Sequence, residues 1–203
     1  MTAPFPTPQP TLGTARLRLR PFTPADAPDV QRYAGDRDVA ATTLSIPHPY
    51  PEGAAERWIG THAAKYADGR LASFAITERE SGALVGAIGL HLEPAHGRAE
   101  LGYWIGKPFW RRGYATEAGQ VMLRFGFEAL GLNKIHAAVF LKNPASDRVL
   151  NKLGMTWEGR LREHDLKWGA YEDIDVYAIL AREWEATHWL SDHHDVAEAG
   201  QAR

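Results

Sequence analysis

The spacing of apolar residues along the chain predicts alternating strands and helices. After Ala118 the apolar residues Val121, Met122, Phe125 and Ala129 recur every three or four positions, which predicts a helix. The same periodicity and the capping signals predict further helices at 24–34, from 51 onward, at 145–153 and at 181–190. Runs of alternating, branched or aromatic residues predict strands at 16–20, 72–77, 83–92, 99–105, 135–141, 155–164 and 171–180.

This order of elements predicts a single α/β domain over residues 14–190, with no internal repeat. Residues 1–13 are rich in proline and threonine and predict a flexible N-terminal arm. Residues 35–50 contain Gly35, Pro47 and Pro49 and predict an irregular segment. Residues 191–203 show no apolar period and predict a mobile C-terminal tail.

The composition excludes several classes of function. A total of 23 basic against 25 acidic residues gives no broad electrostatic case for nucleic acid, so we expect no such partner. No apolar run is long enough to cross a membrane, so we expect no membrane partner either. The chain has no cysteine, which excludes disulfides and a cysteine nucleophile and fits a cytoplasmic protein. Arg16, Arg18 and Arg20 alternate with leucines, which favours a solvated strand face.

A basic glycine turn lies between the strand at 99–105 and the helix after it. The turn contains Arg111, Arg112 and Gly113. A helix N-terminus offers unpaired N–H groups and a partial positive charge, glycine allows close backbone approach, and the arginines add charge. The sequence therefore predicts a phosphate cradle, although it lacks the Lys-Ser/Thr ending of a P-loop and the three-glycine dinucleotide pattern.

The cradle resembles a known coenzyme-binding loop. Trp110-x-x-Gly113-x-Ala115 is similar to the pyrophosphate loop of the GCN5-related N-acetyltransferases (GNAT), which carry Gln/Arg-x-x-Gly-x-Gly/Ala. Tryptophan at the first position departs from that pattern, but the branch resembling ribosomal-protein N-terminal acetyltransferases (RimJ/RimL-like) has an aromatic residue there. That branch continues Gly-Tyr-Ala-Thr-Glu-Ala, as residues 113–118 do. Segments 141–155 and 158–173 resemble later motifs of the same family.

The resemblance implies a fold and a co-substrate. It implies the GNAT fold, a mixed and mostly antiparallel sheet of about seven strands, with strands four and five splayed and about four flanking helices. It implies acetyl-CoA as co-substrate, with the backbone N–H of Ile105 as candidate oxyanion donor. The residues that the resemblance assigns to coenzyme binding are Trp104, Ile105, Gly106, Arg111, Arg112, Gly113, Tyr114, Ala115, Thr116, Asn143 and Ser146.

The catalytic roles are also carried over from the resemblance. Many family members protonate the thiolate with a tyrosine seven residues after the helix asparagine, but Leu150 stands there. The branch implies Ser146 instead, with Tyr114 and water as alternatives. For the base that deprotonates the amine, the branch implies Asp165. Its main competitor is Glu100, which shares a strand face with Trp104. Four weaker options are His91, Glu93, Glu163 and His164.

The acceptor amine stays open at this stage. The favoured function is direct acetyl transfer to a protein or peptide α-amine, and the alternatives are transfer to a small amine and non-catalytic binding of an acyl-CoA. Trp58, Trp157, Trp168 and Tyr50 could wall a small-amine site, although each is more typical of the core. We expect no metal, because none of the nine histidines has His-Glu-x-x-His spacing and His193-His194 lies in the tail. A homodimer is a candidate oligomeric state.

Overall fold

The computed structural model describes residues 5–186, which form one open sheet with helices on both faces. The sheet order is β1-β2-β3-β4-β5-β6-β8-β7. All neighbouring strands run antiparallel except β5 and β6, which are parallel. The strands are β1 (Leu12–Gly13), β2 (Leu17–Arg20), β3 (Leu71–Glu78), β4 (Leu84–Glu93), β5 (Arg98–Ile105), β6 (Lys134–Phe140), β7 (Thr156–Lys167) and β8 (Ala170–Leu180).

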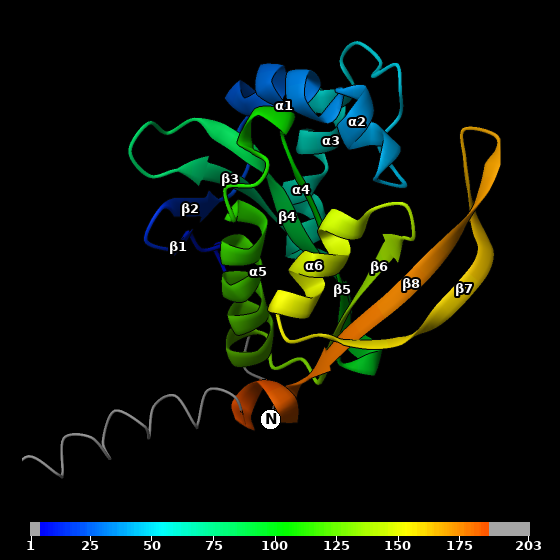
Figure 1. The fold of residues 1–203 in the computed structure, drawn as a ribbon. Helices are drawn as coiled ribbons and strands as arrows, with labels where there is room; N and C mark the ends of the chain where they lie inside the picture. The colour runs from blue at the N-terminus through cyan, green and yellow to red at the C-terminus, as the bar shows by residue number, and fades with distance from the viewer. Residues whose placement is uncertain (1–4, 187–203) are drawn as a thin grey trace, which may run out of the picture.

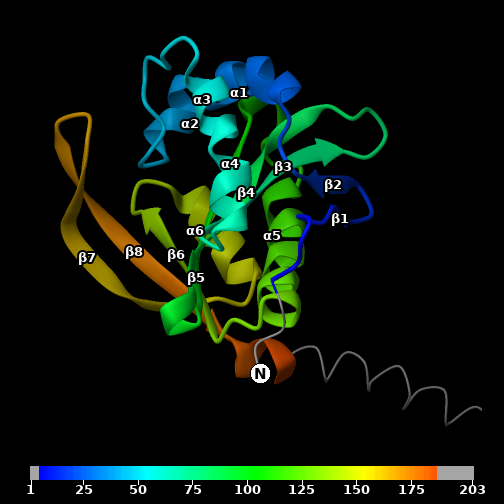
Figure 2. The ribbon, with the colours of Figure 1, turned by 180° about the vertical axis from the view of Figure 1, so that it is seen from behind.

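The helices form two groups, one on each side of the sheet (Figures 1 and 2). They are α1 (Ala27–Ala34), α2 (Arg37–Ala41), α3 (Ala54–Gly60), α4 (His62–Ala67), α5 (Tyr114–Arg124) and α6 (Pro144–Lys152). Helix α5 packs on the face that carries Phe74 and Ile88, while α1 and α3 pack on the opposite face around Ala75 and Trp104. Side chains alternate between the faces of a strand, so each central strand supplies both cores.

Strands β5 and β6 separate shortly after they meet. Their register pairs only Arg98 with Lys134, Ala99 with Ile135 and Glu100 with His136. Both strands continue beyond this point, β5 to Ile105 and β6 to Phe140. The predicted splay of the fourth and fifth long strands is therefore confirmed, and it leaves an edge of β5 open inside the sheet.

The structure differs from the sequence predictions at both ends of the fold. Part of the expected N-terminal arm packs on the domain, because Phe5 contacts Tyr66 and Leu12–Gly13 pairs with β2 as a short additional strand. The segment 35–50, expected to be irregular, contains α2, which Asp36 caps by accepting from the N–H of Asp38. Residues 181–186 are helical as predicted, whereas 187–190, the predicted tail and His193-His194 lie outside the described residues.

Within residues 5–186, no helix combines the length and apolar character needed to span a membrane.

Candidate active site

The predicted phosphate cradle is a turn of left-handed backbone that leads into α5. Gly113 immediately precedes the helix with φ +80°, and Arg111 adopts φ +63°. Both residues and Arg112 are exposed. The first helical residues, Tyr114, Ala115 and Thr116, have N–H groups that no carbonyl of their own helix can reach. These donors and two arginines make a site suited to a phosphate group.

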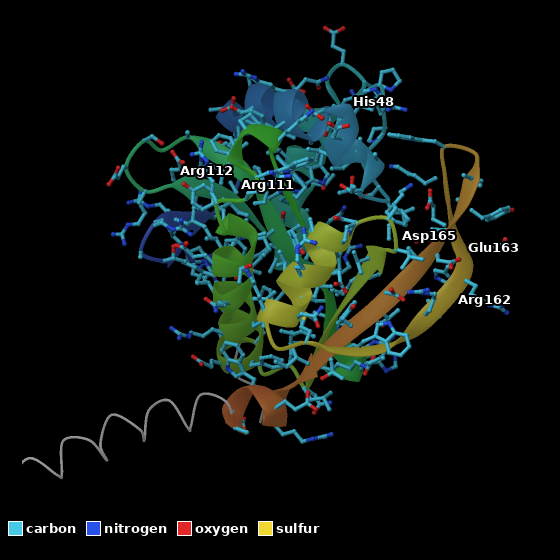
Figure 3. The ribbon with its side chains drawn as sticks, viewed as in Figure 1. His48, Arg111, Arg112, Arg162, Glu163 and Asp165 are labelled. Carbon is cyan, nitrogen blue, oxygen red and sulfur yellow. The ribbon has the colours of Figure 1, made fainter. Side chains whose placement is uncertain are left out.

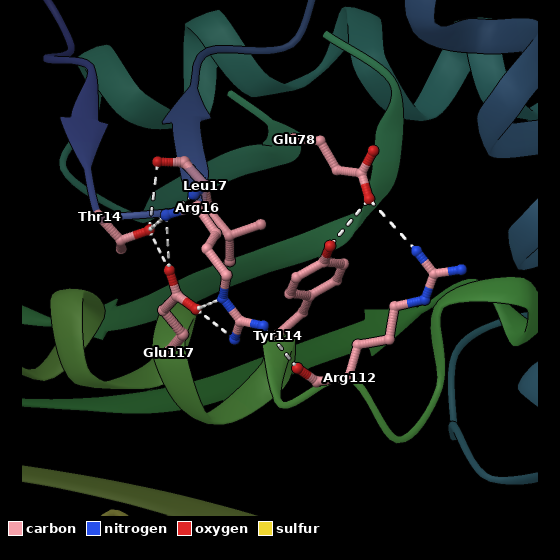
Figure 4. Close-up of polar contacts among 7 residues, drawn as sticks. All are labelled: Thr14, Arg16, Leu17, Glu78, Arg112, Tyr114 and Glu117. Atoms are coloured by element: carbon pink, nitrogen blue, oxygen red, sulfur yellow. Dashed lines mark hydrogen bonds and ion pairs between the residues drawn. The ribbon is translucent and has the colours of Figure 1, made fainter. Parts of the chain in front are cut away.

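An ion pair that the sequence analysis missed holds this helix start. Arg16 donates through Nε to Glu117 Oε2 at 2.7 Å and through Nη1 to the carbonyl of Arg112 at 3.0 Å (Figure 4). Thr14 also donates to Glu117, at 2.5 Å. The expected solvated arginine face is confirmed at Arg16 and Arg18, which are exposed, although Arg16 is also ion-paired. It is wrong for Arg20, which is partly buried and whose guanidinium donates to both oxygens of Asp26.

The side chain of Tyr114 points away from the open edge. Its hydroxyl donates to Glu78 Oε1 at 2.8 Å, and the same carboxylate lies 3.5 Å from Nη1 of Arg112 (Figure 4). The guanidinium of Arg16 lies 4.9 Å from the centre of the Tyr114 ring. Tyr114 thus connects the start of α5 to β3, because its hydroxyl is hydrogen-bonded to Glu78 at the end of that strand.

The end of β5 presents only some of its backbone groups to the splay. The N–H of Gly106 donates to the carbonyl of Val85 at 2.8 Å, so it is used within the sheet. Antiparallel ladders alternate, so the backbone groups of Ile105 point the other way, toward the open edge. There the carbonyl of Ile105 accepts from the indole of Trp110 at 2.6 Å. The side chain of Trp104 is buried against α1 and α3, which leaves only its backbone near the site.

The start of α6 brings two predicted residues together and adds a third. Asn143 caps the helix, its Oδ1 accepting from the N–H of Ser146 at 3.2 Å. Asn143 is therefore a helix cap, and the cap does not use its amide nitrogen. The hydroxyl of Ser146 lies 2.6 Å from the hydroxyl of Tyr103 on β5. Tyr103 was not among the predicted site residues. Leu150 is buried in the core, away from any catalytic role.

The two candidate bases lie on different strands. Glu100 sits on β5 in the last pair before the splay, flanked in register by His91 on β4 and His136 on β6. Asp165 lies on β7 opposite Glu172, on the side of the hairpin that faces the domain in Figure 3. Strands β6 and β8 lie between them, which at strand spacings of about 4.8 Å separates the two carboxylates by more than about 10 Å. The structure therefore does not bring them together.

The hairpin β7–β8 carries an irregular bulge beside Asp165. Leu161 pairs with Ile174 and Asp165 with Glu172, so three residues of β7 lie opposite the single residue Asp173. The carboxylate of Asp173 accepts from the N–H of Glu163, whose φ is +48°. Asp173 thereby orders the backbone of the bulge. An open cavity of about 740 Å³ lies here, lined by Arg160, Leu161, Arg162, Glu163, His164 and Asp173.

The tip of the same hairpin is joined to the segment that follows α2. The ammonium of the buried Lys167 donates to the carbonyls of Leu44, at 3.1 Å, and Ile46, at 2.8 Å. The ring of Trp168 lies 5.6 Å from the guanidinium of Arg37 and 5.9 Å from the ring of His48. We call these contacts of Lys167 and Trp168 with residues 37–48 the hairpin clasp. It fixes the tip of the hairpin to the segment that follows α2.

The four large aromatic residues considered for a small-amine wall divide into two pairs. Trp58 and Tyr50 pack against the core around α1 and α3, as expected. Trp157 and Trp168 are about half exposed on the hairpin, so the core expectation is wrong for them. Trp58 also stacks edge-on against His62, whose ring lies 4.4 Å away.

Comparison with known proteins decides the family. The model of the acetyltransferase (GNAT) domain matches residues 16–156. The chain belongs to the GNAT acetyltransferases. This acetyltransferase is 37% identical over 181 residues to the uncharacterized N-acetyltransferase YoaA of Bacillus subtilis, covering 84% of this chain and 97% of that protein. The ribosomal-protein-serine acetyltransferase of Escherichia coli is 28% identical over 98 residues, covering 48% and 55%.

Solved structures agree with this assignment. RimJ of Mycobacterium smegmatis, in complex with CoA-disulfide, superimposes with a TM-score of 0.78 at 27% identity, covering 86% of this chain and 89% of that one. A spermidine N-acetyltransferase of Vibrio cholerae has a TM-score of 0.70 at 22% identity, covering 84% and 97%, which shows the shared fold alone.

This acetyltransferase uses acetyl-CoA, and the residues present fit that co-substrate. The cradle offers N–H groups at a glycine whose φ of +80° disfavours any side chain, and β5 offers an open edge to the extended arm of the coenzyme. Among residues 5–186, no cluster of three or more histidine, aspartate and glutamate side chains is arranged to hold a metal ion.

Proposed function

We propose that the acceptor of this acetyltransferase is the α-amine of a protein or peptide. The observation that carries the proposal is the exposed apolar character of the β7–β8 hairpin, which also carries Asp165. Five of the eight exposed large apolar side chains in the described chain lie on its two faces, namely Trp157, Leu161, Leu166, Trp168 and Tyr171. Exposed apolar side chains on the hairpin that carries the candidate base suit a polypeptide better than a small polar amine. The relationship to a ribosomal-protein-serine acetyltransferase points the same way.

The proposed mechanism is direct transfer within a ternary complex. The cradle and Asn143 hold the coenzyme, and the N–H of Ile105 stabilises the carbonyl oxygen as it gains charge. Asp165 takes the proton of the amine, with Glu100 as the competing base. The hydroxyl of Ser146 stabilises the leaving sulfur. No cysteine exists to carry a covalent intermediate, so the amine attacks the thioester itself.

Acetylation of peptides and small amines, followed by mass spectrometry, tests the acceptor. We expect N-terminal peptides to react with a higher kcat/KM than polyamines or single amino acids. Replacing the exposed Leu161, which lines the cavity at the bulge, with serine should raise the KM for the peptide about tenfold and leave the KM for acetyl-CoA unchanged. Equal loss with peptides and small amines would contradict a peptide surface on the hairpin.

The hairpin clasp favours a second candidate, a small amine as acceptor. Lys167 ties residues 44–46 to the hairpin, which restrains the movement of both segments and suits a small acceptor better than a large one. If the acceptor is small, Lys167→Met should lower kcat/KM for small amines and open the site to peptides. Lys152→Met, an exposed change at the end of α6, is the matched control.

The same apolar hairpin surface would be buried if the protein forms a homodimer. Sedimentation of the wild type and of the Leu166→Ser, Tyr171→Ser double variant separates these uses. A dimer that dissociates in the variant assigns the surface to a second copy, whereas a monomer in both cases leaves it to the acceptor.

A further inference from the structure

The two sides of the splay are connected by one pair of hydroxyl groups. Tyr103 lies on β5, Ser146 lies in the first turn of α6, and their hydroxyl oxygens are 2.6 Å apart. The residues are 43 positions apart in sequence. Tyr103 shares its strand face with Leu101 and Ile105, which pack toward α5, so the pair lies on the helix side of the gap.

The environment of the pair fixes its protonation. Burial raises the pKa of Tyr103 to about 12, although the hydrogen bond with Ser146 opposes the shift. The phenol is therefore neutral throughout the physiological range and can donate. A serine hydroxyl can accept one hydrogen bond and donate another at the same time. When the phenol donates to Ser146 Oγ, the hydrogen of Ser146 is free to point elsewhere.

The backbone of Ser146 is also held. Its N–H donates to both the side-chain oxygen and the carbonyl of Asn143, at 3.2 and 3.1 Å. The serine is thus fixed at its main chain by the helix cap and at its side chain by Tyr103. The other tyrosine near the cradle, Tyr114, donates to Glu78 and does not compete for this role.

We propose that Tyr103 is a positioning residue, which donates to Ser146 Oγ and thereby directs the hydrogen of Ser146 at the sulfur of the coenzyme. The proposal rests on the role of Ser146 in the proposed function. As the carbon–sulfur bond breaks, the electron pair stays on sulfur and the hydrogen bond from Ser146 stabilises it. The proton of Tyr103 stays on its oxygen, so the step needs no further reactant.

A double-mutant cycle tests whether Tyr103 acts through Ser146. We expect Tyr103→Phe to lower kcat about tenfold while the Kd for CoA changes less than about twofold. In a Ser146→Ala background the same change should have no further effect, because the group it positions is gone. Tyr66→Phe is the matched control, since its part-buried hydroxyl donates to the carbonyl of Pro6 at 2.6 Å and to no residue of the site. Losses that multiply in the double variant would overturn the proposal.

A titration of bound CoA gives a readout that needs no acceptor. The ultraviolet absorbance of the thiolate reports the pKa of the bound thiol. A hydrogen bond from Ser146 favours the thiolate, so this pKa should rise by the same amount in Tyr103→Phe, in Ser146→Ala and in the double variant, and stay unchanged in Tyr66→Phe. An unchanged thiol pKa in Tyr103→Phe would refute the inference. If the wild type binds CoA but acetylates no amine, the proposed function fails, and this titration still decides the role of Tyr103.

Discussion

The guanidinium of Arg16 contacts the carboxylate of Glu117 at 2.7 Å, across 101 residues of sequence. This pair joins the chain before β2 to the first turn of α5, where the cradle begins. Burial alone would raise the pKa of Glu117, but the hydrogen bonds from Thr14 and Arg16 outweigh it and hold this pKa below its ordinary value of 4.5. The carboxylate is therefore worth more to the folded state when it is charged.

We expect Glu117→Gln to lower the free energy of unfolding by about 1–2 kcal/mol at pH 7. Because the pKa is lower in the folded state, this contribution is complete above about pH 4.5 and is lost as pH falls through the folded value. Urea unfolding at pH 7 and pH 3.5 measures the difference. Glu128→Gln is the control, since its pair with Arg124 spans 3.9 Å and is exposed. A pH-independent difference would show that charge is not the cause.

Gly113→Val should weaken acetyl-CoA binding at least tenfold. The reason is backbone strain, because a β-branched residue disfavours the φ of +80°, whereas the nearest atom to a new Cβ, Nη2 of Arg16, is at an ordinary 3.5 Å. Gly69→Val is the matched control, with φ +64° and no atom near its Cβ, in the turn before β3. Calorimetry should show normal affinity for the control and reduced affinity for Gly113→Val. Equal affinities would remove the cradle from the coenzyme site.

Asp165→Asn and Glu100→Gln should differ in their effect on the dependence of rate on pH. If Asp165 is the base, its variant loses the acidic limb of the profile and turnover falls about 10²-fold or more, while Glu100→Gln is mild. The reverse order would assign the base to Glu100, which lies where β5 and β6 part. If neither changes the profile, the amine is deprotonated in solution and the enzyme acts by holding the reactants together.

His62 should make the protein sensitive to acid. It is buried, and neither ring nitrogen has a hydrogen-bond partner among the described residues. Burial, aided by the charges of Lys65 and His91, lowers its pKa from 6.5 to about 4. The unfolded state therefore binds more protons between these values, so stability falls as pH drops from 6.5 toward 4.

We expect His62→Phe to make this slope shallower by up to about 1.4 kcal/mol per pH unit. Thermal or urea unfolding across pH 4 to 7 measures it. His96→Gln, an exposed change in the turn 94–96, should leave the slope unchanged. If His62→Phe and the wild type lose stability in parallel, another group is responsible for the sensitivity.

The local parts of the site could be predicted from sequence, because their signals lie within a few residues. Gly113 before a periodic helix predicted the cradle, and the helix predicted at 145–153 agrees with α6 to within one residue at each end. The splay followed from the family resemblance. In the segment expected to be irregular, only α2 was missed, because the glycine and prolines of residues 35–50 outweighed the propensity of a short capped helix.

The missed contacts all join residues that are distant in sequence. Tyr103 stands at a position of β5 that the alternation of side chains assigns to the core. Its contact with Ser146 exists only because α6 packs beside β5 in the folded protein. Arg16 has the alternation of a solvated face, but Glu117 reaches it from a helix 101 residues later. The pattern of side chains shows which face of a helix or strand is covered, but it does not show which residues cover that face. Partners that are distant in sequence are therefore found only in the three-dimensional structure.

The hairpin clasp holds residues 44–46 through their backbone, whatever side chains they carry. Lys167 binds residues 44–46 by two carbonyl oxygens and makes no demand on their side chains through those bonds. Every amino acid offers the same carbonyl, so the exposed part of this segment can change its side chains while its attachment to the hairpin persists. Randomising the exposed positions 44 and 45, with Lys167 and the core-packed Ile46 retained, should therefore yield mostly folded enzymes with altered acceptor preference, and this segment is the natural starting point for evolving new substrates.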